Sequence, residues 1–149
     1  MQAFMGFLAT LCCAIFTGAA IYVNAVEHPA RMSCGIKAAL SEWAPSYKRA
    51  TVMQASLAVL GFVFSVVAWF AGAKIWVLIA GILLVLVVPF TLIAIMPTNN
   101  RLLALNAEKD ADEAKILLNR WNKLHMVRSA LSLAALIIFL LHALNKYYT

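Results

Sequence analysis

The chain has 149 residues, of which 64% are hydrophobic and 12% charged, and its formal net charge is +6 at pH 7. Soluble domains are nearer half apolar and a quarter charged, so this composition excludes a water-soluble fold and predicts one integral membrane domain. The basic residues flank apolar runs, where they are more often topology signals than phosphate ligands, which argues against nucleic-acid binding.

Four apolar runs are long enough to cross a bilayer, whose hydrocarbon core of about 30 Å needs about 20 helical residues. They cover about 3–26, 50–71, 75–96 and 125–144. Residues 72–74 alone separate the second run from the third, whereas longer connections join the other runs. The sequence therefore predicts an all-α, antiparallel bundle of four transmembrane helices, with both long connections on one side and both termini on the other. No Lys or Arg precedes the first run, so we expect a membrane helix there and not a signal peptide.

The two long connections have different predicted structures. In the second, Asp110 and Glu113 have the spacing of a helix-capping box, and apolar residues then recur at helical spacing. This pattern predicts an interfacial amphipathic helix over about 110–124 that continues into the fourth span. In the first, Pro29 disfavours a helical His28, so the first helix is expected to end there. Pro97 is likewise expected to end the third helix.

The charged residues orient the predicted bundle. All Lys and Arg residues except Lys74 and Lys146 lie in or beside the two long connections, and so do all six acidic residues. By the positive-inside tendency the long connections face the cytoplasm, in the inner or plasma membrane if the source is bacterial. Lipid is then the immediate surrounding of the chain.

Polar and ionisable side chains occur near the cytoplasmic end of every predicted span. Trp121, His125 and Arg128 occupy positions i, i+4 and i+7 and therefore form one stripe at the start of the fourth span. Each cluster also has a structural explanation, such as a hydrated helix end, an interhelical hydrogen bond, or Glu27 paired with Arg31 or Arg128. Together they predict a small-molecule pocket between the helices. The predicted substrate-binding residues are His28, Tyr47, Gln54, Thr91, Asn99 and Trp121.

Several of these motifs together resemble a known family. Glu27-His28-Pro29-Ala30-Arg31, residues 43–47, Val88-Pro89-Phe90-Thr91, Met96-Pro97-Thr98-Asn99 and the Trp121, His125, Arg128 stripe resemble the pattern of the anthrone oxygenase family. The resemblance runs from about Thr17 to Leu141. It implies a four-helix membrane protein and, for fungal members, oxidation of a polyketide anthrone to an anthraquinone with molecular oxygen. Most bacterial members are of unknown function.

The chemistry that the resemblance implies assigns roles to three predicted catalytic residues. His125 is the predicted base, because imidazole titrates near working pH. Arg128, with Asn99 or Tyr47 as a further donor, would stabilise the developing oxyanion. Glu27 would orient His125 or pair with Arg128. Molecular oxygen is the co-substrate in this hypothesis, and no cofactor is required.

Three other hypotheses compete with this one. His28, His125, Glu27 and Asn99 offer ligands for a metal or haem, although no ligand spacing indicates such a site. A four-helix glutathione-type membrane transferase matches in size and topology only. A non-catalytic lipid or quinone binder, or an accessory subunit of a membrane complex, would instead turn its polar clusters outward. Such a subunit would also expose small-residue stripes such as Gly61 with Ser65 to partners. Either a homo-oligomer or a larger membrane complex is compatible with the sequence.

The three cysteines suit neither a redox relay nor a metal site. Cys12 and Cys13 are adjacent, Cys34 stands alone, and no Cys-x-x-Cys motif occurs. A thiol–disulfide relay therefore lacks its working pair.

Overall fold

A computed structural model describes residues 1–145, and every regular element in that range is helical. The elements are α1 (Gln2–Tyr22), the π-helical turn η1 (Val23–Glu27), α2 (His28–Ser33), α3 (Ile36–Phe70), α4 (Ile75–Val85), α5 (Val87–Phe90), the π-helical turn η2 (Thr91–Ile95), α6 (Met96–Ala104) and α7 (Ala111–Asn145). They join into four continuous runs that are each long and apolar enough to cross a membrane. The prediction of an all-α protein with four spanning helices is confirmed, and the chain is a multi-pass integral membrane protein.

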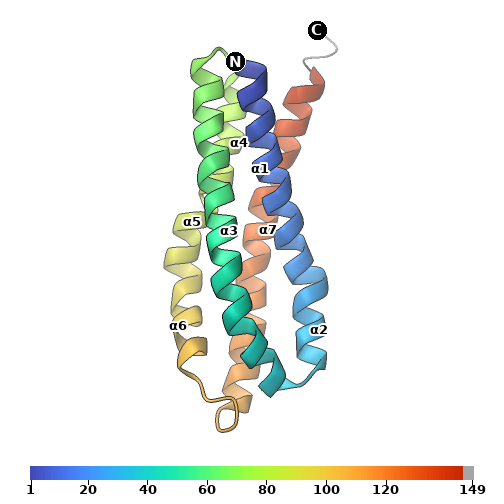
Figure 1. Cartoon of the computed structure of the whole chain (residues 1–149), viewed down its shortest axis with the longest axis vertical. Coiled ribbons are helices and arrows are strands. Elements are labelled where there is room, and N and C mark those ends of the chain that lie inside the picture. The colour runs from blue at the N-terminus through green and yellow to red at the C-terminus, as the bar shows by residue number, and fades with distance from the viewer. Residues whose placement is uncertain (146–149) are drawn as a thin grey trace.

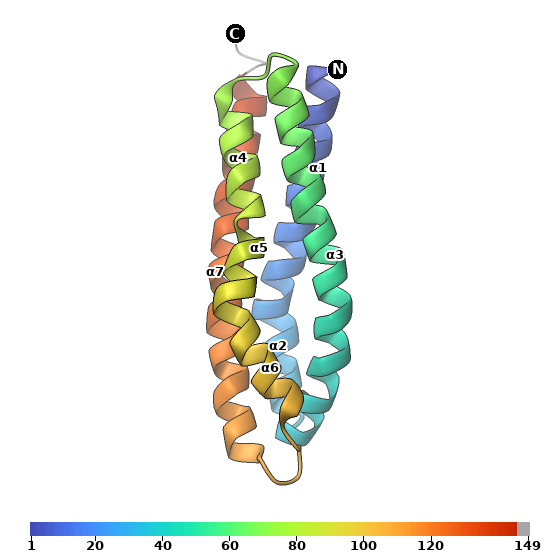
Figure 2. The same ribbon diagram turned by 90° about the vertical axis from the view of Figure 1, so that its left-hand side faces the viewer.

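The four runs alternate in direction and pack as an antiparallel bundle (Figures 1 and 2). α1 packs against α3 and α7, and α4 packs against the same two helices from the opposite side. The N-terminus, the turn between α3 and α4, and the end of α7 lie at one end of the molecule (Figure 1). Gly72 takes a positive φ of 98° in that turn, and its carbonyl accepts a hydrogen bond from Gln2. We call this the terminal end, and the opposite one the connection end.

The prolines do not end the first and third helices, so the predictions at Pro29 and Pro97 are wrong. In both places a π-helical turn of five residues comes first, and the proline follows one residue later, in the first turn of the next helix. A proline ring clashes with the carbonyl four residues earlier in a regular α-helix. The wider π turn shifts the hydrogen bonds to i→i−5, as from His28 N–H to the Val23 carbonyl, and the helix continues.

The predicted first connection is also mostly helical. α3 begins at Ile36 and runs through Pro45 without a break, so only Cys34 and Gly35 separate it from α2. Gly35, with a φ of 87°, makes the reversal. The third run bends in stages through α4, α5 and α6 (Figure 2), and the first break is at Leu86, three residues before Pro89.

The amphipathic segment 110–124 continues into the fourth span without a break, as predicted, because α7 is one helix from Ala111 to Asn145. The apolar stripe of this segment packs against other parts of the bundle and not against the membrane surface. Ala114, Leu118 and Trp121 are buried in a cluster with residues of α3 and α6. The stripe is therefore part of the bundle at the connection end.

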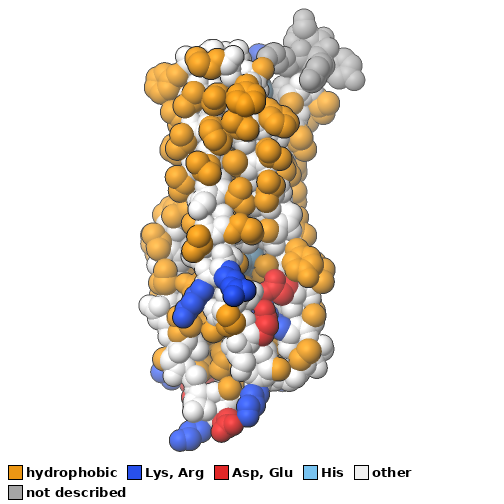
Figure 3. Space-filling model, in the orientation of Figure 1, with side chains coloured by type: hydrophobic (Ala, Val, Ile, Leu, Met, Phe, Trp, Pro, Cys, Tyr) orange, Lys and Arg blue, Asp and Glu red, His pale blue; other side chains and the backbone are white. Residues whose placement is uncertain are grey.

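Charged side chains gather at the connection end, while the other half of the surface is largely hydrophobic (Figure 3). A run of 35 residues is about 52 Å long at 1.5 Å per residue, which exceeds a hydrocarbon core of about 30 Å. The connection end therefore extends into the headgroup region and water. Lys74 lies in the turn at the terminal end, and Lys146 lies outside the described residues.

The small residues at the terminal end pack inside the bundle and not against a partner. Gly61 and Ser65 are both buried. A Cβ added at Gly61 would lie 2.6 Å from a methyl of Leu84, and one added at Gly81 would lie 2.5 Å from Ser65. The stripe of Gly61 and Ser65 therefore lets α3 approach its neighbours closely, and it is not the exposed stripe that the accessory-subunit hypothesis required.

Candidate functional site

Two hydrophobic clusters fill the bundle, and a layer of polar side chains lies between them. One cluster belongs to the terminal half and contains residues such as Phe16 and Ala135, and the other belongs to the connection half around Trp43 and Trp121. Along α7, the stretch from His125 to Ser132 falls between Trp121 and Ala135. We call this stretch and its partners on the other helices the polar layer. Its members are Thr17, Asn24, Gln54, His125, Arg128, Ser129 and Ser132.

Arg128 carries a buried positive charge in this layer. Its side chain comes from α7, and the residue is 9% exposed. Nη2 donates a hydrogen bond to Oε1 of Gln54 over 2.7 Å, and the guanidinium carbon lies 5.6 Å from the ring centre of Phe16. Within residues 1–145 no carboxylate forms an ion pair with Arg128. A guanidinium buried without a carboxylate is costly, and it favours binding of a negatively charged or oxygen-bearing guest.

His125 lies one turn before Arg128 and is 3% exposed. Its Nδ1 is 3.1 Å from Oδ1 of Asn24 in η1. The same oxygen accepts a hydrogen bond from Ser129, at 2.6 Å. Asn24, which was not among the predicted site residues, is therefore the group that holds this imidazole. The sequence feature that could have identified Asn24 is that it is the single amide in the first apolar run, because polar groups inside membrane spans are functional candidates by default.

Glu27 has a different partner from the two that the catalytic hypothesis gave it. It pairs with Arg31 one turn later and accepts a hydrogen bond from Ser46 at 2.7 Å. Arg31 also pairs with Glu42 at 2.6 Å, and its guanidinium lies 5.8 Å from the ring centre of Trp121. Pairing with Arg31 was the structural alternative, and the contacts bear it out. In the structure Glu27 touches neither His125 nor Arg128 by hydrogen bond or ion pair.

A small cavity of about 20 Å³ lies among these groups. Its lining includes six of the predicted site residues, namely Glu27, Tyr47, Gln54, Trp121, His125 and Arg128. Its volume is close to that of one water molecule. Its other lining residues are Val23, Arg31, Ser46, Ala50 and Thr51.

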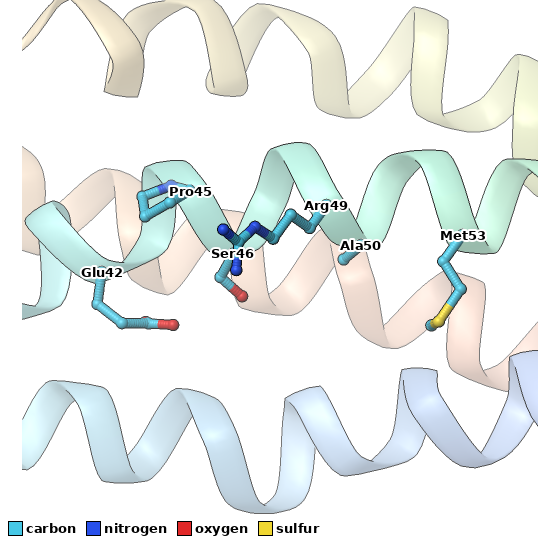
Figure 4. Close-up of a pocket in the computed structure, with 6 residues that line it drawn as sticks. All are labelled: Glu42, Pro45, Ser46, Arg49, Ala50 and Met53. Carbon is cyan, nitrogen blue, oxygen red and sulfur yellow. The ribbon is translucent and has the colours of Figure 1, made fainter.

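Two further hollows adjoin this cavity because they share lining residues with it. An apolar chamber of about 80 Å³ between α3 and the bent third run shares Thr51, Gln54 and Arg128, and Thr91 lies in its wall. An open groove of about 470 Å³ runs along α3 on the side of α1 and α2 (Figure 4). The groove shares Ser46 and Ala50 with the cavity. The cavity thus lies between a larger polar-rimmed groove and a smaller apolar chamber.

Of the predicted substrate-binding residues, His28 and Asn99 do not line the small cavity. His28 is buried with its ring 6.3 Å from that of Trp121. Asn99 is fully buried near the connection-half cluster, and neither its amide nitrogen nor its carbonyl oxygen has a hydrogen-bond partner. The Asn99 side chain therefore donates no hydrogen bond toward the cavity in this structure, although it was predicted as a donor to the substrate. Tyr47 stacks on Trp43 at 5.1 Å and places its hydroxyl 3.8 Å from the Met96 sulfur.

The proposed metal ligands do not converge. Within residues 1–145 no group of three or more His, Cys, Asp or Glu side chains is arranged to hold a metal ion. Glu27 is engaged by Arg31 and Ser46, and His125 by Asn24. The cysteines of the described range are all free thiols.

The fold and the site define a class: a four-helix membrane protein with a buried, cationic polar layer between its helices. The family model for anthrone oxygenase matches residues 43–138. An anthrone oxygenase of Claviceps purpurea (strain 20.1) is 31% identical over 139 residues, covering 82% of this chain and 78% of the fungal protein. No solved structure matches significantly. The chain belongs to the anthrone oxygenase family, as the sequence motifs indicated.

Proposed function

We propose that this protein is an oxygenase that oxidises a small aromatic substrate of the anthrone or hydroquinone type with molecular oxygen, inside the polar layer. The observation that carries the proposal is the placing of His125, Arg128 and Tyr47 around one cavity, with no carboxylate paired to the arginine. The similarity to a fungal anthrone oxygenase supports the same reaction type. The polar clusters face the bundle interior, which is the arrangement expected of an enzyme and not of a lipid-facing accessory subunit.

The proposed reaction begins with proton removal. An anthrone has a methylene group between two aromatic rings, and this carbon acid becomes an enolate when it loses a proton. His125 accepts the proton, and the electron pair moves onto the oxygen of the ketone group on the opposite side of the central ring. Arg128 binds this oxygen as it becomes negative. Because no carboxylate of residues 1–145 pairs with the arginine, its charge is available for this oxygen.

Molecular oxygen then takes up the electrons. The enolate carbon forms a bond to one oxygen atom, and the protonated adduct is a hydroperoxide. Loss of water from it breaks the O–O bond and leaves a carbonyl group. The methylene carbon is oxidised to a ketone, one oxygen atom stays in the product, and the other leaves as water. No redox cofactor is needed for the electron balance.

We further propose that the substrate arrives through the groove along α3. The cavity itself is too small for a tricyclic molecule, whereas the groove of about 470 Å³ has the size of a small-ligand site. Entry past Ser46 and Ala50 would require the hydrogen bond between Ser46 and Glu27 to open. Tyr47, which lines the cavity, offers an aromatic ring at the end of this route and is itself stacked on the fully buried Trp43 with an interplanar angle of 2°.

The test uses the purified full-length protein in lipid nanodiscs with 1,8-dihydroxyanthrone as substrate. Oxygen uptake and the absorbance of the anthraquinone are followed under air and then under ¹⁸O₂. We expect saturable turnover above the rate in empty nanodiscs, with one labelled oxygen in the new carbonyl. Saturable binding without oxygen uptake above the empty-nanodisc rate would refute the enzymatic proposal and favour a non-catalytic quinone or lipid binder.

A further inference from the structure

The side chain of Asn24 has all its hydrogen-bonding capacity in use. Its amide nitrogen donates to the Asn122 main-chain carbonyl at 3.1 Å and to the Asn122 side-chain oxygen at 2.6 Å. Its oxygen lies 3.1 Å from His125 Nδ1 and 2.6 Å from the Ser129 hydroxyl. An asparagine amide has two donors and two acceptor positions, and all four are engaged here.

The main-chain carbonyl of Asn122 decides which way this amide is turned. A carbonyl oxygen only accepts hydrogen bonds, so the group that faces it has to be the NH₂ of Asn24. The Asn24 oxygen is then directed to His125 and Ser129. If the amide were reversed, two carbonyl oxygens would lie 3.1 Å apart, and a buried repulsion would replace a hydrogen bond.

The orientation of the amide in turn decides the tautomer of His125. An oxygen acceptor at Nδ1 requires that Nδ1 carries the hydrogen, because the ring otherwise presents a lone pair to an oxygen lone pair. In a neutral imidazole the other nitrogen, Nε2, then has the free lone pair. Nε2 lies on the ring edge away from Nδ1 and is therefore the basic atom.

Asn24 reaches this position because of the π turn. It is the second residue of η1, and the buried positions on either side of it, Val23 and His28, are five residues apart. A π turn inserts an extra residue into the helix and is frequent at functional sites. Here the turn accommodates Pro29 and also places an amide against α7.

We infer that Asn24 is a positioning residue that locks His125 in the Nδ1–H tautomer and so leaves Nε2 as the base. This inference rests on the proposed function only for the role of the base. The tautomer itself follows from the hydrogen bonds between Asn24, Asn122 and His125. The two claims are therefore tested by different measurements on the same samples.

The tautomer is measured by solid-state ¹⁵N NMR of the full chain, labelled at histidine, in lipid nanodiscs at pH 7.5. Protonated and unprotonated ring nitrogens have well-separated ¹⁵N shifts, and a His125→Gln sample assigns the signals. We expect His125 to be neutral, with hydrogen on Nδ1. In Asn24→Leu, which fills the site without an acceptor, we expect loss of this single tautomer.

Two variants separate positioning from general damage. Asn24→Gln keeps an amide, with both a donor for Asn122 and an oxygen acceptor, and should retain more of the Nδ1–H tautomer than Asn24→Leu does. Ser129→Ala removes the other hydrogen bond to the same oxygen and should leave the tautomer unchanged. Thermal unfolding in detergent shows which variants are folded. A wild-type His125 with hydrogen on Nε2, or a tautomer that Asn24→Leu does not alter, overturns the inference.

Turnover provides the second readout. Asn24→Leu should lower kcat on 1,8-dihydroxyanthrone on the order of 10–100-fold with little change in KM, as removal of a group that orients a base does. Asn24→Gln, which keeps the amide, should lose less turnover than Asn24→Leu. If the tautomer responds as expected but neither wild type nor variants turn over any anthrone, the positioning role stands and the proposed function fails.

Discussion

Replacing Arg128 by methionine separates what this side chain does for the fold from what it does for chemistry. Methionine is unbranched and uncharged and has a similar volume although it is shorter, so it can fill much of the space between Gln54 and Phe16. The structure gives Arg128 one hydrogen bond, to Gln54, and one ring contact, to Phe16. We expect Arg128→Met to fold normally and to lose most of its activity.

The expected effect on stability follows from three opposing contributions. A hydrogen bond from a charged donor contributes about 1.5–3 kcal/mol. A cation–π contact contributes about 0.5–2 kcal/mol. Burial of the guanidinium costs several kcal/mol, and replacing buried ionic groups by apolar ones of similar volume is often neutral or stabilising by about 1–4 kcal/mol.

The methionine variant leaves the Gln54 oxygen without its donor, at a cost of about 1–3 kcal/mol. The double variant Arg128→Met, Gln54→Leu removes that cost as well. We therefore expect the single variant to unfold near the wild-type temperature and the double variant at or above it. Turnover should fall on the order of 10²–10³-fold in both, the cost of removing one oxyanion donor.

Thermal unfolding in detergent and initial rates on 1,8-dihydroxyanthrone measure the two effects. Arg128→Lys is the matched control, because it keeps the positive charge and should retain more turnover than methionine does. A double variant several kcal/mol less stable than wild type would show that the arginine is structural. Full turnover in Arg128→Met would remove it from the proposed chemistry.

Three other predictions follow from the packing and from the surface. Gly81→Ala places a methyl group 2.5 Å from a side chain of α3 and should cost about 1–3 kcal/mol in unfolding free energy. Gly18→Ala meets nothing within 4 Å and should be neutral or slightly stabilising, so equal melting temperatures for the two would contradict the close α3–α4 packing. Ala50→Trp narrows the way from the groove to the cavity and should raise KM about tenfold while changing kcat less, whereas an unchanged KM would favour entry through the apolar chamber. Cys34 is exposed at the connection end, so a membrane-impermeant maleimide should label it from the cytoplasmic side, and a cysteine introduced at Lys74 should react only from the other side. The opposite labelling would invert the proposed topology.

The four spans were predictable because bilayer thickness sets the length of an apolar helix. Span length can be read from each segment alone, without knowing how the helices pack on one another. The ends of the helices could not be predicted in the same way. Pro29 and Pro97 looked like helix ends because proline removes one donor and clashes with one carbonyl. A π turn before each proline relieves both problems, and nothing in the local composition announces such a turn.

The partner of Glu27 shows how an error in local structure changes a site. If the helix ended at His28, Glu27 would be free to reach Arg128. Because the helix continues, Arg31 comes to lie one turn after Glu27 on the same face, and the two pair. The i, i+4 spacing was visible in the sequence, but its meaning depended on helix continuity.

The stripe of Trp121, His125 and Arg128 was predictable from spacing, since one helix face is a local property. Asn24 was not, because its partners lie on α7 about one hundred residues away in the chain. Only the packing of α1 on α7 sets which amide faces which imidazole. Asn99 shows the opposite error. Its position near the end of the third helix suggested a hydrogen-bond donor to the substrate, but the packing of the helices buries it, and it is not among the residues that line the cavity.

The most direct test of the account compares His125→Gln with His142→Gln in the ¹⁸O₂ assay. Both changes remove an imidazole from α7, but His142 lies in its last turn, at the terminal end. If His125 is the base, His125→Gln lowers formation of labelled anthraquinone on the order of 10²–10⁴-fold, the usual contribution of a general base. His142→Gln should form labelled anthraquinone at the wild-type rate. Equal rates of labelled product in His125→Gln and wild type would contradict the account.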